Sequence, residues 1–191
     1  MDQPPRESPG QNLTLNALVR RLAHEKIRQF SGDATIEIEE LEGEQMPILG
    51  HWMAIILVSG ESLHLTLKTH FATSEVARIM PASPDLVNVG RLTMMARDFV
   101  KEFCNLVAGS IKLALHNQGI ATGISLPLVT RGFDELFESH GTGQVVESDR
   151  WKFSLEGASI VITTEVLASK DLKITEPGES AGDSLGDVEF F

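Results

Sequence analysis

Two acids, an amide and a glycine follow one another at helical spacing in the middle of the chain: Asp98, Glu102, Asn105 and Gly109. At about 100° per residue, these positions fall within roughly 60° of arc on one helix. We call them the acid-amide stripe. The stripe is expected to border the buried face, because a mainly apolar set centres about a quarter-turn away: Leu92, Met95, Phe99, Phe103, Leu106, Ser110 and Leu113. It would offer a carboxylate and a carboxamide, one turn apart, to a molecule docking from outside.

Other chemistry is poorly supported. The six histidines lack zinc-ligand spacing, and no second histidine completes a metalloprotease helix. The segment from Gly141 to Gly143 lacks the third glycine and the lysine of nucleotide loops, so we interpret it as a turn. Ser125 and Ser159 lie in predicted strands without a nucleophile elbow. Cys104, the single cysteine, has no activating base nearby in sequence and is expected to be a small buried or half-buried residue.

Composition favours one globular domain. A chain of 191 residues with 42% apolar residues can bury roughly 70% of its unfolded surface. The net charge of −11 disfavours nucleic-acid and anionic-membrane partners, which attract Lys and Arg. No apolar run approaches the ~18 residues that span a bilayer. The N-terminus lacks a secretory pattern, and one cysteine allows no internal disulfide, so we expect a cytoplasmic protein.

The first half of the chain predicts a helix, three strands and a short second helix. Apolar spacing of three and four indicates the helix at 13–30, and alternation of Ile with Glu indicates a half-buried strand at 34–41. The strands at 52–58 and 63–67 flank a turn at Gly60, which predicts a hairpin. The short helix, 73–80, is closed by Pro81.

The second half begins with a long helix that reaches about Asn117 and stops at Gly119. A strand follows over 123–132, where Pro127 removes a donor and argues for an edge, a bend or a bulge. Two more strands are predicted at 151–155 and 159–166. The order of helix, strands, helices and strands suggests a structural motif used twice, although no sequence identity proves a repeat.

Both ends of the chain are polar. We expect a flexible N-terminal tail at 1–12, a domain at 13–169 and a flexible acidic C-terminal tail at 170–191. The chain ends in Val-Glu-Phe-Phe at 188–191, which either docks on a partner as a short peptide or has no role. Deleting residues 171–191 and measuring partner binding would decide between these two possibilities.

The segment from Glu102 to Gly109 resembles the CheX branch of the CheC/CheX/FliY chemotaxis phosphatases. The family motif is acid-x-x-x-Glu-x-x-Asn, matched here by Asp98, Glu102 and Asn105. Small residues up to Gly109, a helix end near Gly119 and the later Ile-Ser-Leu-Pro strand at 124–127 add to the likeness. It covers about residues 16–168.

The resemblance implies an α/β (α+β) fold with pseudo-duplicated halves, in which helices pack on a central, mostly antiparallel sheet. Family members dephosphorylate the chemotaxis response regulator CheY. CheC and FliY relatives commonly carry two motifs and CheX-like members one. The first helix has Arg28 where a second asparagine would follow Glu25, which favours the CheX branch and, with it, a homodimer.

On this interpretation, the partner is a phosphorylated CheY-like receiver domain. The Asn105 carboxamide would hold a water in line with the phosphorus, because an amide can donate and accept without adding negative charge. Glu102 would pair with the lysine that receivers keep beside the phosphoaspartate. Asp98 would attract a basic rim or only solvate the helix. Gly109 would allow close approach of the partner or of another part of this domain.

No cofactor or metal site is expected on this chain, since the Mg²⁺ that neutralises the phosphoryl oxygens would belong to the partner. Two alternatives stay open. The same fold could be a non-catalytic receiver-binding, flagellar-switch or adaptor module that senses phosphorylation without hydrolysing it. It could also be a dimeric scaffold in which the helix motif is vestigial.

Overall fold

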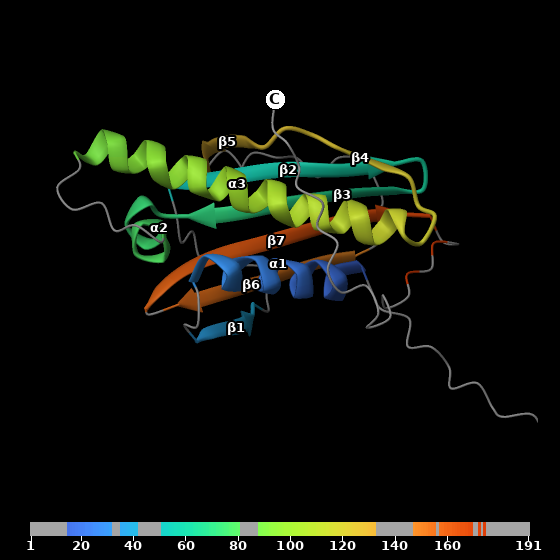
Figure 1. Cartoon of the computed structure of the whole chain (residues 1–191), viewed down its shortest axis with the longest axis horizontal. Helices are drawn as coiled ribbons and strands as arrows, with labels where there is room; N and C mark the ends of the chain where they lie inside the picture. The colour runs from blue at the N-terminus through green and yellow to red at the C-terminus, as the bar shows by residue number, and fades with distance from the viewer. Residues whose placement is uncertain are drawn as a thin grey trace, which may run out of the picture.

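A computed structural model of the chain describes residues 15–31, 35–41, 51–80, 88–132, 147–155, 157–169, 172 and 174. Within these residues, seven strands form one antiparallel sheet in the order β1-β6-β7-β3-β2-β4, with β5 also pairing with β2 (Figure 1). The strands are β1 (Ile36–Glu40), β2 (Trp52–Gly60), β3 (Leu63–Phe71), β4 (Thr122–Ile124), β5 (Leu128–Arg131), β6 (Glu147–Leu155) and β7 (Ala158–Ala168).

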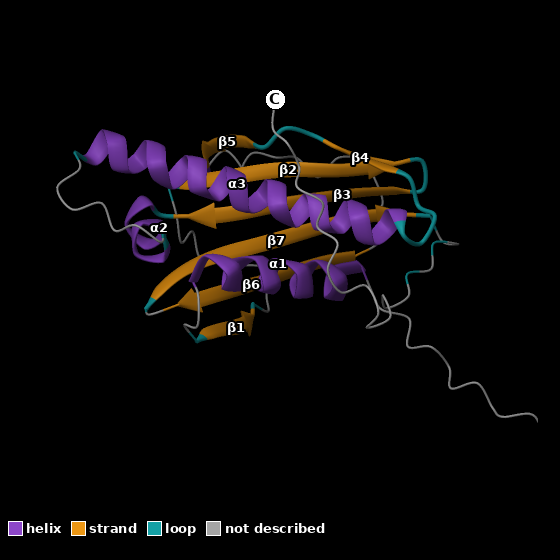
Figure 2. Ribbon diagram, in the orientation of Figure 1, coloured by secondary structure: helices purple, strands orange, loops and turns teal. Residues whose placement is uncertain are grey.

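Three helices are described: α1 (Leu15–Ser31), α2 (Thr73–Ile79) and α3 (Val89–His116). Helices α1 and α3 cover the same face of the sheet, and α2 lies at one end of it (Figure 2). The Glu75 carboxylate of α2 accepts a hydrogen bond from the backbone N–H of Ser159, 2.8 Å away, at the start of β7. None of the described helices has the length and apolar character needed to cross a membrane.

The strand order is symmetric under exchange of two α-β-β-β units. One unit runs α1-β1-β2-β3, and the other runs α3-β4/β5-β6-β7, with α2 between them. Each unit places its last strand at the centre of the sheet and its first strand at the opposite edge, beside the middle strand of the other unit. This arrangement confirms the predicted pseudo-duplicated halves and places α1 and α3 in equivalent positions.

The core fills the space between the two long helices and the sheet. Alternate residues of the central strands supply it, as expected for strands with one face against helices. Their buried side chains include Ala54, Ile56, Val58, Leu63, Leu65, Leu67, Ile160, Ile162 and Val166. Burial of this apolar surface, at about 25 cal/mol per Å², holds α3 against the sheet.

The strand predicted at 123–132 is divided at Pro127. Ile124 pairs with Val58 and Leu128 pairs with Ile55, so three residues of this edge face two of β2. The extra residue makes a bulge. The Ser125 hydroxyl accepts a hydrogen bond from the N–H of Leu57 at 3.0 Å. This bond satisfies a backbone donor of β2 at the point where the bulge interrupts the strand pairing.

Most predicted elements are confirmed within a few residues, including the 60–61 hairpin and the stop at Gly119, where φ is +77°. The strand at 34–41 was predicted to be half-buried, but Ile38 is 39% exposed in β1. As an edge strand, β1 pairs with β6 alone among the described strands. The predicted turn at 141–143, the tail at 1–12 and the chain end at 188–191 lie outside the described residues. Two residues of the predicted C-terminal tail, Leu172 and Ile174, pack on the core.

Candidate functional site

Helix α3 presents the acid-amide stripe on the side opposite the sheet. Asn88 caps the N-terminus of the helix, and its side chain accepts a hydrogen bond from the N–H of Arg91 at 2.9 Å. Its buried side chains all lie toward the sheet side: Ala96, Val100, Phe103, Cys104, Val107, Ala108, Ile111, Ala114 and Leu115. At 100° per residue this set centres about half a turn from the stripe. The stripe therefore faces away from the core.

The predicted orientation of α3, with the stripe bordering the buried face, was wrong. Of the apolar set used for that prediction, only Phe103 is fully buried, most of the others are half-buried, and Leu113 is 53% exposed. One of these half-buried side chains, Phe99, packs against Phe30 of α1. The helix thus has two apolar stripes. The one with the smaller residues lies against the sheet, because alanine and cysteine permit a close approach.

Glu102 and Asn105 are both exposed, one turn apart on α3. Within the described part of the chain, neither side chain makes an ion pair or hydrogen bond. The carboxylate and the carboxamide are consequently available to a second molecule. Several turns of helix anchored on the sheet hold the backbone that carries them.

Asp98 differs from Glu102 because it has a partner of its own. Its carboxylate accepts a hydrogen bond from Nζ of Lys101 at 2.8 Å, and the two side chains are 62% and 37% exposed. An exposed pair at this spacing contributes little to stability. It does neutralise the charge of Asp98, so that Glu102 is the unpaired carboxylate of the stripe among the described residues.

Gly109 closes the stripe with open space around it. A Cβ built at this position would meet no atom within 4 Å outside the backbone of its own helix turn. Close approach of another described part of this domain is therefore not the reason for a glycine here. The other reason expected from the sequence, approach of a partner, stays a prediction.

Cys104 lies behind the stripe and is fully buried. Burial raises the pKa of its thiol to about 12, because desolvation disfavours the thiolate. A hydrogen bond between the sulfur and Oγ1 of Thr69, 3.4 Å apart, lowers the pKa by a smaller amount. The thiol stays protonated at neutral pH. The prediction of a structural rather than nucleophilic cysteine agrees with this burial.

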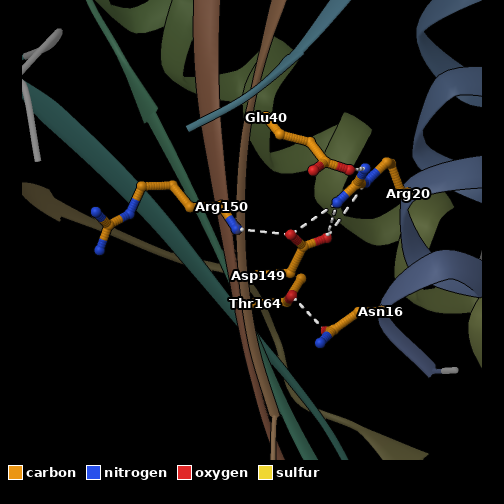
Figure 3. A network of polar contacts seen from close by, with 6 residues as sticks. All are labelled: Asn16, Arg20, Glu40, Asp149, Arg150 and Thr164. Carbon is orange, nitrogen blue, oxygen red and sulfur yellow. Dashed lines mark hydrogen bonds and ion pairs between the residues drawn. The ribbon is translucent and has the colours of Figure 1, made fainter. Parts of the chain in front are cut away.

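The equivalent helix α1 carries Glu25 and Arg28, both exposed, and no asparagine at the second position. Its inner side is fixed by a polar network (Figure 3). Arg20 donates to both carboxylate oxygens of Asp149, at 2.7 and 2.8 Å from Nη2, and also pairs with Glu40. Desolvation lowers the pKa of Arg20, but these two carboxylates outweigh it and raise the pKa overall.

One group that involves α3 was missed by sequence reasoning. The guanidinium carbons of Arg97 and Arg131 lie 4.7 and 5.1 Å from the ring centroid of Trp52. These cation–π contacts tie α3 and β5 to β2. Their three residues are remote in sequence, and no local pattern could have signalled the contact. No group of three His, Cys, Asp or Glu side chains in the described residues could hold a metal ion.

Solved structures of CheX proteins share this fold. A chain of the CheX-CheY-BeF3-Mg²⁺ complex from Borrelia burgdorferi is similar with a TM-score of 0.65 and 16% identity, over 81% of this chain and 98% of that one. CheX from Vibrio vulnificus has a TM-score of 0.55 and 14% identity, over 80% and 99%. CheX from Desulfovibrio desulfuricans has a TM-score of 0.52 and 15% identity, over 80% and 99%.

No protein-family model and no curated protein sequence matches the chain. The likeness is therefore one of three-dimensional structure. It confirms the predicted fold, a CheC/CheX-like α+β arrangement of helices on an antiparallel sheet, over about four-fifths of the chain.

Proposed function

We propose that this chain, which has the CheC/CheX fold, is a phosphatase for the phosphoaspartate of a CheY-like receiver domain. The observation that carries the proposal is the exposed pair Glu102 and Asn105, unpartnered in the described residues and directed away from the core. The CheX-CheY complex from Borrelia burgdorferi, whose fold is shared, supports the choice of partner. We place the reaction in the cytoplasm.

The proposed reaction is attack by water on an acyl phosphate. Asn105 enters the partner's site, and its carboxamide holds a water in line with the phosphorus. The water oxygen forms a bond to phosphorus while the bond between phosphorus and the aspartate oxygen breaks. The aspartate leaves as a carboxylate, and the protons of the water remain with the inorganic phosphate and solvent.

One amide is enough for the acceleration such a labile bond requires. A ~100-fold increase in rate corresponds to about 2.7 kcal/mol. A positioned hydrogen-bonding group at a reacting centre supplies about 2.7–4 kcal/mol. The carboxamide adds no negative charge beside the phosphoryl group, as a carboxylate in its place would.

Glu102 would anchor the complex through an ion pair with a lysine of the receiver. An unpaired carboxylate one turn before the amide suits this role, whereas Asp98 is already paired with Lys101. In the proposed complex, Asp98 and Gly109 are contact positions at and beyond this pair. The partner's Mg²⁺ would neutralise the phosphoryl oxygens, and this chain would contribute no metal ligand.

We also propose a homodimer through the sheet edge formed by β4 and β5, which pair with β2 alone among the described strands. Leu126 and Leu128 at this edge are 89% and 63% exposed, whereas the opposite edge strand, β1, carries Glu37, Glu39 and Glu40. Charged side chains protect an edge from pairing, and apolar ones favour it. Light scattering should therefore give a dimer that Leu128→Lys shifts toward the monomer. A monomeric parent chain would contradict this part of the proposal.

The test is phosphate release from a panel of phosphorylated receivers. Addition of the unmodified protein should shorten the acyl-phosphate lifetime, Asn105→Ala should abolish the effect with some binding kept, and Glu102→Ala should also weaken binding. Matched controls are Asn117→Ala, an exposed amide at the end of α3, and Glu25→Ala, an exposed acid of α1. Binding with an unchanged lifetime would instead identify a non-catalytic receiver-binding module.

A further inference from the structure

Two apolar side chains share the exposed side of α3 with the acid-amide stripe. Met94 is 57% exposed and Leu113 is 53% exposed. At 100° per residue, Met94 points about 40° to one side of Asp98, and Leu113 about 60° to the other. Both therefore face outward with Glu102 and Asn105. Neither belongs to the hydrophobic core.

The two side chains are placed symmetrically about Glu102 and Asn105. Met94 precedes Glu102 by eight residues, and Leu113 follows Asn105 by eight. At 1.5 Å per residue each is about 12 Å along the helix from the nearer group, and the pair spans about 28 Å. A standard interface buries about 800 Å² per partner, which is roughly 30 Å across. An interface of this size, centred between Glu102 and Asn105, also covers Met94 and Leu113.

We propose that Met94 and Leu113 are the apolar anchors by which α3 selects its receiver domain. This inference rests on the proposed function. The partner surface would carry a cation beside its phosphoaspartate, opposite Glu102, and an apolar side chain about 12 Å away on either side. A receiver with charged groups at those two places would bind poorly. Its charged groups would lose their hydration on contact with Met94 and Leu113, and neither side chain offers a hydrogen bond or an opposite charge in return.

The anchors act on association and leave the chemical step unchanged. Met94→Ser and Leu113→Ser should each raise the dissociation constant for the receiver about tenfold, as expected for removing a largely covered apolar side chain from an interface. The sites are far apart, so the double variant should lose about a hundredfold. Turnover at saturating receiver should match the parent protein, since Asn105 keeps its position.

The experiment uses the full chain and receivers carrying beryllofluoride and Mg²⁺ in place of the phosphoryl group. Dissociation constants are measured by titration, and KM and kcat by phosphate release. Val89→Ser is the matched control, because Val89 is 79% exposed on α3 but points about half a turn from the stripe. Met94→Leu, which keeps an apolar side chain at this position, should bind the receiver as tightly as the parent. The substituted positions are exposed, so the variants keep the melting temperature of the parent.

The outcomes separate this inference from the proposed function. If the parent binds tightly and both serine variants have the same dissociation constant, Met94 and Leu113 are not anchors. The phosphatase proposal then stays intact. Weaker binding by the variants, with no hydrolysis by the parent, supports the anchors and overturns the phosphatase. Reduced kcat at saturation would contradict a role confined to binding. Binding by none of the receivers would overturn both.

Discussion

The ring of Phe30 in α1 meets the ring of Phe99 in α3 edge to face, with centroids 4.9 Å apart and planes at 63°. This contact joins the two long helices of the pseudo-duplicated halves. It also fixes the rotation of α3 about its axis, because Phe99 points about a quarter-turn from the stripe. With Phe99 against α1 and the smaller residues against the sheet, Glu102 and Asn105 have to face solvent.

Replacing Phe99 by alanine should therefore loosen α3 as well as destabilise the domain. Removal of a half-buried ring is expected to lower the free energy of unfolding by about 2 kcal/mol. In a double-mutant cycle, Phe30 and Phe99 should couple by about 0.5–1.5 kcal/mol, the range for aromatic pairs. Urea unfolding of the parent, the two single variants and the double variant measures both quantities. Strict additivity would show that the pair does not act as a unit.

The sequence identified the elements better than it identified their faces. Gly119 and Pro127 marked the end of α3 and the division of the edge strand, because one adopts a positive φ and the other lacks an N–H donor. The orientation of α3 was missed because the helix carries two apolar stripes, and the prediction used the one that contains Phe99 and Leu106. Ala96 and Cys104 lie against the sheet, whereas the larger Phe99 lies between helices.

At the candidate site, too, the sequence predicted positions along a helix but not the contacts of the side chains. Spacing alone placed Glu102 and Asn105 on one side of a helix, and both are exposed together. Periodicity could not show that Asp98 is held by Lys101, because the choice of rotamer decides between a pair and two solvated charges. Contacts between distant segments, such as Arg97 and Arg131 on Trp52, depend on strand register and have no local signature.

The network on α1 gives a prediction for stability. Asp149 is 15% exposed and accepts three charge-assisted hydrogen bonds from Arg20, so Asp149→Asn should lower the free energy of unfolding by about 1–2 kcal/mol. Glu40 is 62% exposed, and water screens its pair with Arg20. Glu40→Gln should therefore cost less than about 0.5 kcal/mol. Chemical denaturation at neutral pH compares the two variants, and equal losses would contradict the assigned difference.

Cys104 makes stability depend on alkaline pH. Burial raises the pKa of the thiol to about 12, whereas an unfolded cysteine titrates near 8.5. Between these values the unfolded chain binds fewer protons than the folded one, so the free energy of unfolding falls as pH rises. At pH 10 the loss is about 2 kcal/mol relative to neutral pH.

The control for this pH effect is Cys104→Ala, which is less stable at neutral pH but lacks the thiol titration. The chain has no tyrosine, so lysines are the main other groups that titrate in this range, and they are common to both proteins. The difference in free energy of unfolding between parent and variant should therefore narrow as the pH rises from neutral to about 10. A difference independent of pH would contradict burial of a neutral thiol.

Gly109 and Gly60 should respond to the same substitution in opposite ways. A methyl group at Gly109 enters open space, so Gly109→Ala should raise the free energy of unfolding by about 0.5–1 kcal/mol through helix propensity. At Gly60 the new Cβ would lie 2.4 Å from the carbonyl oxygen of Ala121. Gly60→Ala should therefore destabilise the protein by about 2 kcal/mol. Thermal and urea unfolding distinguish the signs.

The gain in stability at Gly109 then isolates what the glycine does for a partner. If a receiver approaches the α3 backbone here, Gly109→Ala should weaken receiver binding even though the variant is more stable, because the methyl group occupies the contact. Stability and binding would move in opposite directions, which no folding defect produces. A variant that gains stability and binds the receiver as tightly as the parent would remove Gly109 from the proposed interface and leave Glu102 and Asn105 as its centre.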